Sequence, residues 1–356
     1  MAYSGTVGQT VVSVQKFIDQ GARMAGKLAE ELTVEQVQAS KQALFFILSN
    51  LINQGINYWC IDKKVYGMKA DQYEYLLPLG GNDVLNALYR RMNRPTPNGT
   101  GGYIGSSGNL GLAFDNNVLT SDVQTSPNGY IGIDYGLNNP IYAGSIGILP
   151  STSGSFHILL EWSDDGTTWN LLQDTGVTTW ASGEWLWYDI DPGKTCQAYR
   201  MRETGGGTLS VAEFYVGNNS TEVTMARLNR DDYTNLPNKN FTANQPYQFW
   251  FNRTLPQSKI VLWPTPSDPF VQMTIWYSRQ VMDVGDLYGE LEIPQYFYQA
   301  IQCMLAHQMS LVLPGVDLPR IQYLEGQADK YFTMAENENR DKSPIYYAPN
   351  ISVYTR

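Results

Sequence analysis

The chain has 356 residues, which is enough for two or three domains with buried cores. Apolar residues make up 43% of it against 16% charged residues, and it contains 24 Tyr, 12 Phe and 9 Trp. This composition is that of a globular, aromatic-rich protein and excludes an intrinsically disordered chain. The 24 Lys and Arg against 34 Asp and Glu give a net charge of −10. Non-specific binding to nucleic acid needs clustered positive charge, so we do not expect it.

The number of cysteines and the lengths of the apolar runs indicate whether the protein is disulfide-bonded and whether it spans a membrane. Cys60, Cys196 and Cys303 are odd in number and widely spaced, which indicates reduced, buried thiols rather than a disulfide framework. No stretch approaches the ~18 apolar residues of a membrane-spanning helix, and the N-terminus lacks a basic region followed by a long apolar run. We expect a soluble protein without a membrane partner.

The N-terminal part is predicted to hold two helices. An apolar stripe at three- and four-residue spacing predicts the first, and it comprises Val14, Phe17, Ile18, Ala25, Leu28 and Leu32. Thr33 and Gln36 form a capping-box pattern at the start of the second helix, and Gly55 is a natural C-cap for it. We expect the second helix to pack antiparallel to the first.

Strands and two further helices follow. Alternation of side-chain type predicts strands at 72–75 and 271–278. Pro294 stands in the predicted first turn of a third helix, which ends at Pro314. The apolar face of a fourth helix comprises Ile321, Leu324, Ala328, Tyr331, Phe332 and Ala335. The last segment, 343–356, has two prolines, three tyrosines and no helical period, so we expect an extended arm.

Residues 97–218 differ in composition from the rest of the chain. They contain three basic and twelve acidic residues, so −9 of the net charge of −10 lies in this segment and −1 elsewhere. The segment is rich in Gly, Ser, Thr, Asn and Trp, and it is bracketed by the linker-like stretches PTPNGTGGYIGSSG and VGNNST. We interpret it as an inserted domain.

Four stretches outside the insert occur in the order GKLAEELT (26–33), GINYW (55–59), RDDYTNLPNK (230–239) and LWPTP (262–266). In this order they resemble the head-to-tail connector, or portal adaptor, of short-tailed bacteriophages. The resemblance implies a helical bundle with a small β element, formed by residues 1–96 and 219–342 and assembled as a ring of twelve copies beneath the portal. It also implies a location in the neck or tail of the virion, after assembly in the host cytoplasm. The implied partners are the portal protein, tail nozzle or tail fibre proteins, and genomic DNA that passes through the channel without specific binding.

Aromatic side chains are the candidate contacts in such an assembly. A ring subunit presents two complementary faces to its neighbours, and Tyr and Trp are enriched at the centres of interfaces. The candidate interface residues are Trp59, Trp250, Trp263 and Trp276, each of which could equally fill the core of the monomer. The candidate portal-binding residues of the arm are Tyr346, Tyr347 and Tyr354, with a frayed tail as the alternative.

Five short stretches follow one another within the insert: AFDN (113–116) with Thr120, YIGIDYG (130–136), LEWSDDGTTW (160–169), YRMR (199–202) and VAEF (211–214). Their order resembles a discoidin-type, galactose-binding-like domain, which implies a jelly-roll β-sandwich. The residues point to the same fold, because apolar Phe156, Ile158, Leu160 and Trp162 alternate with His157, Leu159 and Glu161 ahead of an Asp-Gly turn. We therefore predict an α+β protein, an adaptor-type helical bundle with a small β element interrupted by an inserted antiparallel β-sandwich.

The resemblance also implies ligands for the sandwich. The loop equivalent to 115–120 often holds calcium in that family, and the candidate ligands are Asp115, Asn116 and Thr120, although calcium takes six to eight oxygens. The candidate residues for stacking on sugar rings or for docking are Trp180, Trp185 and Trp187, with core packing as the alternative. We expect the sandwich to dock other tail proteins, and a glycan-binding adhesin of the tail is the alternative function.

Candidate catalytic groups are few. His157 and His307 are the only histidines, and the glycine-rich stretch 99–108 lacks the Lys-Ser/Thr of a phosphate loop. A glycosidase needs two carboxylates that face each other, whereas adjacent residues such as Asp164 and Asp165 point to opposite faces of a strand. We expect no enzymatic activity and no cofactor other than calcium.

Overall fold

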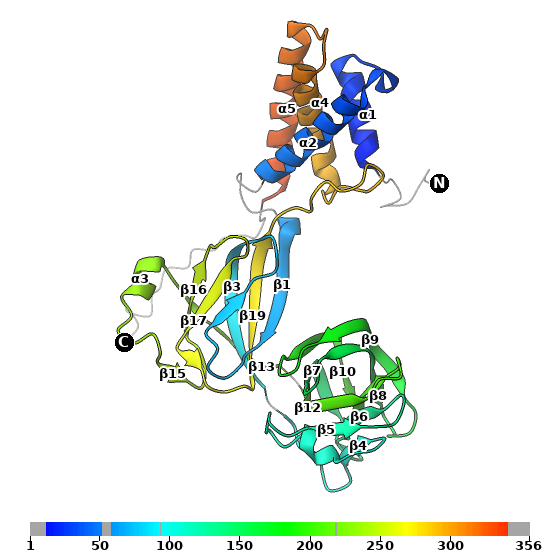
Figure 1. The fold of residues 1–356 in the computed structure, drawn as a ribbon, viewed down its shortest axis with the longest axis vertical. Helices are drawn as coiled ribbons and strands as arrows, with labels where there is room; N and C mark the ends of the chain where they lie inside the picture. Colours follow the sequence, from blue (N-terminus) through cyan, green and yellow to red (C-terminus); the bar gives the residue numbers. More distant parts are fainter. Residues whose placement is uncertain (1–11, 52–57, 93, 218, 341–356) are drawn as a thin grey trace, which may run out of the picture. The chain divides into compact units, whose positions relative to one another are not determined.

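The structure is a computed structural model. The residues that it describes are 12–51, 58–92, 94–217 and 219–340. The chain divides into two compact units, one formed by Met1–Ile61 with Ser278–Arg356 and the other by Asp62–Tyr277. The first unit is helical and the second is built of β-sheets (Figure 1). No helix in the described part of the chain is long and apolar enough to span a membrane.

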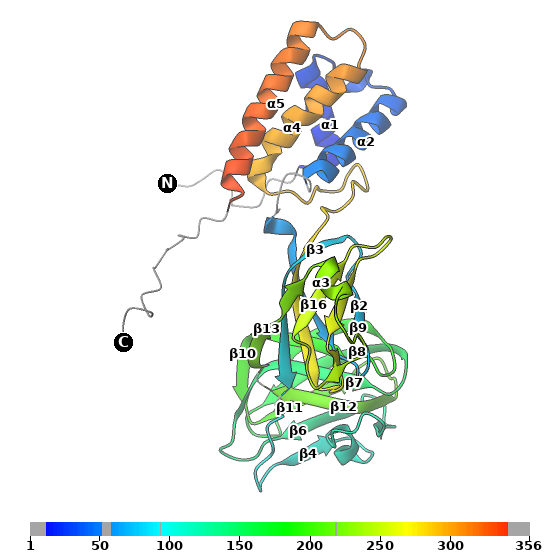
Figure 2. The ribbon, with the colours of Figure 1, turned by 90° about the vertical axis from the view of Figure 1, so that its left-hand side faces the viewer.

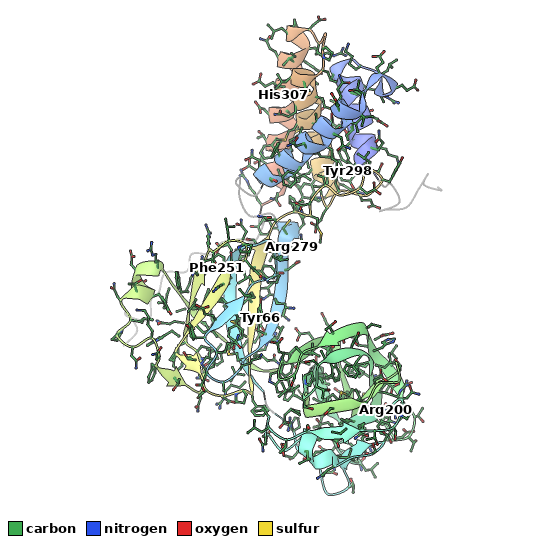
Figure 3. The ribbon with its side chains drawn as sticks, viewed as in Figure 1. Tyr66, Arg200, Phe251, Arg279, Tyr298 and His307 are labelled. Atoms are coloured by element: carbon green, nitrogen blue, oxygen red, sulfur yellow. The ribbon has the colours of Figure 1, made fainter. Side chains whose placement is uncertain are left out.

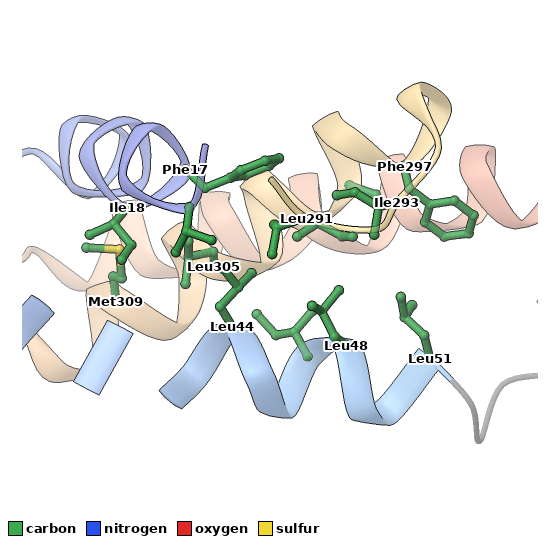
Figure 4. Packing of buried hydrophobic residues seen from close by; sticks show 14 of the residues in the cluster. Phe17, Ile18, Leu44, Leu48, Leu51, Leu291, Ile293, Phe297, Leu305 and Met309 are labelled. Carbon is green, nitrogen blue, oxygen red and sulfur yellow. The ribbon is translucent and has the colours of Figure 1, made fainter. Parts of the chain in front are cut away.

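Four α-helices form one bundle in the helical unit (Figures 1 and 2). They are α1 (Val14–Ala25), α2 (Val34–Leu51), α4 (Gln295–Val312) and α5 (Leu318–Glu338), with short 3-10 helices at Ala29–Glu31 and Tyr58–Cys60. Phe17 of α1, Leu44 and Leu48 of α2 and Leu305 of α4 meet in a shared core, together with Ile293 just before α4 (Figure 4). The bundle is therefore held by burial of apolar side chains from segments far apart in the sequence.

The first helix is shorter than predicted. Gly26 ends it in a left-handed conformation with φ +88°, which glycine adopts without the steric cost of a side chain. The apolar stripe predicted that the helix continues to Leu28 and Leu32, and this prediction is wrong beyond Ala25. Leu28 is exposed, and Leu32 packs against the core from outside the helix.

The start of the second helix is confirmed. The backbone amide of Thr33 donates to Gln36 Oε1 (2.9 Å), and the amide of Gln36 donates to Thr33 Oγ1 (3.3 Å). These two bonds form the reciprocal capping box. The helix is described to Leu51, and the predicted C-cap Gly55 lies outside the described residues.

The two C-terminal helices are also confirmed. Helix α4 begins directly after Pro294 and ends at Val312, two residues before Pro314. The predicted apolar face of α5 supplies buried Leu324, Ala328 and Ala335 and the partly buried Tyr331 and Phe332. The four predicted helices are present, while their assignment to an adaptor-type bundle stays a prediction.

Strands on either side of the insert form a small β element within the β unit. Its sheets have the orders β1-β19-β3-β13 and β14-β16-β17-β2, and β15 pairs with β18. The strands are β1 (Ile61–Gly67), β2 (Glu74–Leu76), β3 (Gly81–Met92), β13 (Asn219–Thr224), β14 (Ala226–Leu228), β15 (Thr242–Ala243), β16 (Gln248–Asn252), β17 (Lys259–Trp263), β18 (Thr265–Pro266) and β19 (Val271–Arg279), with the short helix α3 (Arg230–Thr234) after β14. Strand β19 contains the whole strand predicted at 271–278. Strand β2 overlaps the strand predicted at 72–75 at Glu74 and Tyr75, whereas Gln72 and Tyr73 precede it.

The segment between β3 and β13 folds as an antiparallel β-sandwich. Its sheets have the orders β4-β6-β11-β8-β9 and β10-β7-β12-β5, and every pair of neighbouring strands in them is antiparallel. The strands are β4 (Gly102–Gly105), β5 (Asp122–Gln124), β6 (Tyr130–Asp134), β7 (Ile141–Pro150), β8 (Gly154–Ser163), β9 (Asn170–Trp180), β10 (Leu186–Cys196), β11 (Ala198–Glu203) and β12 (Leu209–Gly217), with a 3-10 turn at Leu110–Ala113. Ile131, Ile148, Leu160 and Phe214 belong to the shared core of the two sheets.

The boundaries of the two compact units differ from the boundaries of the predicted domains. The predicted body, 1–96 with 219–342, places its helices in one unit and most of its strands in the other, together with the sandwich. Arg90 of β3 is one link between the two parts of the β unit. It forms ion pairs with Glu222 of the small β element and with Asp189 of the sandwich.

Strand β8 departs from the predicted alternation at its end. Phe156, Ile158 and Leu160 are buried in the core as predicted. Trp162, however, is only partly buried, and Glu161, which was expected on the solvent side, is buried. The reason is that two arginines of β11 cover the Glu161 carboxylate and pair with it.

Candidate functional site

A cleft of about 660 Å³ lies in the β unit, between the small β element and the sandwich. Strands β1, β2 and β17 line one side of it, and residues 184–186 of the sandwich line the other. The lining residues are Lys64, Val65, Tyr66, Gly67, Lys69, Gln72, Glu74, Tyr75, Leu76, Glu184, Trp185, Leu186 and Lys259, of which Figure 3 labels Tyr66. The volume falls in the range of sites for small molecules.

Trp185 provides the aromatic wall of the cleft. Its indole stacks on that of Trp187, with ring centroids 4.9 Å apart and 22° between the planes, and its Nε1 donates to the carbonyl of Pro269 (3.2 Å). Phe270 meets the same ring edge-on at 6.1 Å. Gly67 permits this approach, because a Cβ at position 67 would lie 2.2 Å from the Cβ of Trp185. These contacts hold the indole in one orientation.

Charged side chains of the cleft stand in pairs. Lys69 Nζ lies 3.0 Å from Glu184 Oε1, and Lys259 Nζ lies 3.1 Å from Glu74 Oε2. All four side chains are more than a third exposed, so each pair contributes at most about 1 kcal/mol to stability and its members can bind a ligand instead. Lys64 is exposed on β1 and forms no ion pair with another residue that the structure describes. The lining therefore carries one excess positive charge.

Two tyrosines of the cleft keep their phenol protons. The hydroxyl of Tyr66 donates to the carbonyl of Leu76 (2.9 Å), and the hydroxyl of Tyr75 accepts the amide of Lys69 (3.0 Å). Burial raises the pKa of Tyr66, and the neighbouring Tyr277 raises it further. Burial raises the pKa of Tyr75 to about 12, against the lowering effect of the Lys69 amide. Both rings are thus neutral hydrogen-bonding groups at ordinary pH.

Of the three tryptophans predicted to bind glycan or to dock, Trp185 is the one in the cleft lining. Trp180 is 1% exposed and packs against Phe156 in the sandwich core, which is the core-packing alternative stated for it. It stands at the end of β9 with its side chain turned inward, which neighbouring sequence does not reveal. Trp187 lies behind Trp185 and over Gly147, where a Cβ would come within 2.4 Å of its ring.

The tryptophans predicted at subunit interfaces have contacts within the chain. The contacts are Trp59 with Phe297 (ring centroids 5.1 Å apart), Trp250 with Tyr233 (4.8 Å) and Trp263 Nε1 with the carbonyl of Asn238 (2.9 Å). Trp276 on β19 is 41% exposed and keeps the most surface for a partner. A role of these residues in an interface stays a prediction. The predicted portal-binding residues Tyr346, Tyr347 and Tyr354 lie outside the described residues.

The loop predicted to bind calcium is closed by its own hydrogen bonds. Asp115 Oδ1 accepts the amide of Asn117 (2.8 Å), and Asp115 Oδ2 accepts the hydroxyl of Thr120 (2.7 Å). Asn116 has φ +60°, and its Oδ1 accepts Arg94 Nη1 (3.1 Å). Calcium takes six to eight oxygens, whereas Asp115, Asn116 and Thr120 together carry four side-chain oxygens, all of them engaged in hydrogen bonds within the chain. They do not fit a calcium shell, and the described residues contain no group of three or more His, Cys, Asp or Glu that could hold a metal ion.

Asp165 and His157, two of the residues considered for catalysis, have local structural partners. Asp165 Oδ1 accepts the amides of Thr168 (2.7 Å) and Thr167 (2.8 Å), and these bonds hold the pKa of its carboxyl well below the usual range. His157 Nε2 lies 2.7 Å from Asp174 Oδ1 across the hairpin of β8 and β9. The hydrogen bonds of Asp165 stabilise the predicted turn between β8 and β9. The contact of His157 with Asp174 joins the two strands themselves.

A buried ion network on the sandwich was not predicted. Glu161 Oε2 accepts Arg200 Nε (2.6 Å) and Oε1 accepts Arg202 Nη2 (2.6 Å). The guanidinium of Arg200, labelled in Figure 3, lies 4.9 Å from the ring centre of Tyr130 and 4.1 Å from that of Trp169. Burial raises the pKa of Glu161, but the hydrogen bonds from Arg202 and Arg200 outweigh it and lower the pKa overall. The Arg-x-Arg spacing on one strand, which puts both arginines on one face, was the available signal.

No family model matches the chain, and no curated protein matches it. Solved structures match about a third of it. The family 32 carbohydrate-binding module of Clostridium perfringens NanJ, in complex with galactose, is 17% identical with a TM-score of 0.28, over 36% of this chain and 98% of that one. The CBM32 module of AlyQ, in complex with 4,5-unsaturated mannuronic acid, is 10% identical with a TM-score of 0.29, over 35% of this chain and 96% of that one.

A glycoside hydrolase is also among the matches. The family 89 enzyme from Clostridium perfringens is 18% identical with a TM-score of 0.29, over 34% of this chain but only 14% of the enzyme. The resemblance to a head-to-tail connector has no counterpart in these comparisons and stays a prediction.

Proposed function

We propose that the β unit binds carbohydrate in the cleft beside Trp185. The observation that carries the proposal is the combination, in one cleft of about 660 Å³, of a fixed indole with Lys and Glu side chains. Sugar rings have C–H groups that pack on aromatic surfaces, and hydroxyls that exchange hydrogen bonds with ammonium and carboxylate groups. The cleft offers a partner for each kind of group.

The charge of the lining favours an acidic sugar. Three lysines against two glutamates leave one excess positive charge, and Lys64 has no carboxylate partner among the residues that the structure describes. A sugar carboxylate placed near Lys64 would form a charge-assisted hydrogen bond. We expect 4,5-unsaturated mannuronic acid to bind more tightly than galactose, and these two sugars serve as the acidic and the neutral probe.

The test is isothermal titration calorimetry on the full chain with both probes. Trp185→Ala removes the aromatic wall and is expected to weaken sugar binding about tenfold, which corresponds to ~1.4 kcal/mol. Trp276→Ala removes an indole of the same size that is exposed on β19 outside the cleft, and it is the matched control. We expect this control to bind sugar like the unaltered chain.

Circular dichroism establishes that both variants are folded before their affinities are compared. The cleft is the wrong site if Trp185→Ala binds sugar as well as the unaltered chain, or if Trp276→Ala weakens binding equally. Absence of binding by the unaltered chain to either sugar would contradict the proposed function itself.

Helix α2 favours a second function, the assembly of this chain with copies of itself. The helix buries Leu44 and Leu48 in the core, yet Val34 is 78% exposed and Phe46 is 58% exposed. Two hollows of about 610 and 630 Å³ lie along α2 and share Ala39 and Gln42 in their linings. The outer side of α2 therefore carries exposed Phe45 and Phe46 among polar residues such as Gln38 and Gln42, and exposed aromatic side chains of this kind are candidates for burial against a partner.

We propose a second copy of the chain as the cover of α2, in the ring-shaped adaptor that the connector resemblance implies. In this proposal the chain is a virion structural protein that joins the portal to the tail and encloses the DNA channel. The net charge of −1 outside the insert supports a wall along which DNA can slide without being held. Carbohydrate binding by the β unit and assembly by α2 involve different units and are compatible.

A further inference from the structure

Arg94 lies between β3 and β4, and its guanidinium reaches the loop that was predicted to hold calcium. Its Nη2 donates to Glu213 Oε2 on β12 (2.6 Å), and its Nη1 donates to Asn116 Oδ1 (3.1 Å). The Arg94 side chain is 13% exposed, and that of Glu213 is 0% exposed. The ring centre of Phe114 lies 5.7 Å from the guanidinium carbon. A positive charge is thus fixed between the loop and strand β12.

Glu213 needs a cation in this position. Burial raises the pKa of its carboxyl, and the charge and hydrogen bond of Arg94 lower it. Asp115 raises this pKa as well, the backbone amide of Asn117 lowers it, and the net shift is upward. A buried carboxylate without a counter-charge is strongly unfavourable. The second carboxylate oxygen, Oε1, is buried and has no donor at hydrogen-bonding geometry among the described residues. The Arg94 guanidinium therefore supplies the compensating charge.

We propose that Arg94 takes the place of a divalent cation here and makes the order of the 115–120 loop independent of calcium. The predicted ligands do not fit a calcium shell, and the side-chain oxygen of Asn116 accepts a hydrogen bond from Arg94. A guanidinium holds two acceptors through two directional, charge-assisted bonds and does not need six to eight oxygens. Because Arg94 precedes residue 97, the sandwich receives this cation from outside the predicted insert.

The test is hydrogen exchange of the 113–120 segment, measured by mass spectrometry on the full chain in EDTA and in calcium chloride. We expect the unaltered chain to exchange equally in both. Arg94→Ser frees Glu213 and the Asn116 oxygen, so we expect about tenfold faster exchange in EDTA and partial recovery in calcium chloride. Arg253→Ser is the control, because Arg253 is an exposed arginine that pairs with Asp83 on the small β element.

An effect of calcium or EDTA on the unaltered chain would overturn the proposal, because a metal ion would then act at this site despite Arg94. Unchanged exchange in Arg94→Ser would overturn it as well, since Arg94 would not hold the loop. Faster exchange without recovery in calcium would show an ordinary ion pair and no replacement of a cation. Should Arg94→Ser fail to fold, Arg94→Gln keeps more of the side-chain volume and still removes the charge. Faster exchange that calcium chloride partly reverses supports the proposal in that variant, and faster exchange without recovery, or unaltered exchange, contradicts it.

Discussion

Glu161 shows how a charged side chain can be buried on a strand whose sequence places it at the surface. Its two carboxylate oxygens accept bonds from Arg200 and Arg202, and Arg200 in turn lies over the ring of Trp169. The guanidinium groups replace the water that the carboxylate loses on folding. Such a network stabilises only while it is complete, because removal of one partner leaves the others buried and unpaired.

Glu161→Gln keeps the shape of the side chain and removes its charge, so we expect the β unit to lose about 3 kcal/mol in its free energy of unfolding at neutral pH. Against the opposing effect of burial, the arginines lower the pKa of Glu161 in the folded chain. The stabilisation is therefore complete above the ordinary carboxyl pKa of 4.5 and is lost as the pH falls through the folded value. Urea unfolding at neutral and acidic pH measures both effects.

Glu184→Gln is the matched control, because the side chains of Glu184 and of its partner Lys69 are both more than a third exposed. We expect this control to change stability by less than about 1 kcal/mol. An equal loss in the two variants would mean that the Glu161 network contributes no more than a surface pair. A Glu161→Gln variant that keeps the acid-dependent decline of the parent would contradict the role assigned to its pKa.

At the scale of elements, periodic patterns predicted most of the fold. The capping box at Thr33 and the apolar face of α5 could be read directly, because a helix that packs on one side repeats its apolar residues every three or four positions. The end of α1 could not be read from its stripe, since Leu28 keeps the spacing while Gly26 leaves the helix. Trp185 was a candidate, but its cleft was not predictable, because the contact with Gly67 joins distant parts of the sequence.

The capping box of α2 gives a prediction for one element. Thr33→Ala removes the hydroxyl that accepts the Gln36 amide, and we expect the helical unit to lose about 1 kcal/mol of stability. Thr33→Ser retains a hydroxyl at the N-cap and should restore most of this loss. Urea unfolding followed by far-UV circular dichroism makes the comparison. Equal stability of the Ala and Ser variants would mean that the side chain of residue 33 does not cap the helix.

At the scale of the whole molecule, the insertion of the sandwich has a simple geometric basis. Strands β3 and β13, which lead into and out of the insert, are antiparallel neighbours in one sheet, and Met92 pairs with Asn219 in their register. The chain therefore leaves and re-enters the small β element at adjacent positions. A domain whose ends lie close together can be inserted without changing the sheet that carries it. The sandwich also has its own core, separate from those of the small β element and the helices.

Assembly through α2 is the prediction for the whole molecule. Size-exclusion chromatography with light scattering should give the unaltered chain a mass several times the 40.0 kDa of one copy. Phe45→Ser combined with Phe46→Ser removes exposed apolar surface from α2 and should return the chain to 40.0 kDa, because burial of this surface drives the association. Tyr323→Ser changes an exposed aromatic residue of α5 and should leave the assembly intact. A mass of 40.0 kDa for the unaltered chain at every concentration would contradict assembly. If the unaltered chain assembles and the double variant assembles equally well, then α2 is not the surface that joins the copies.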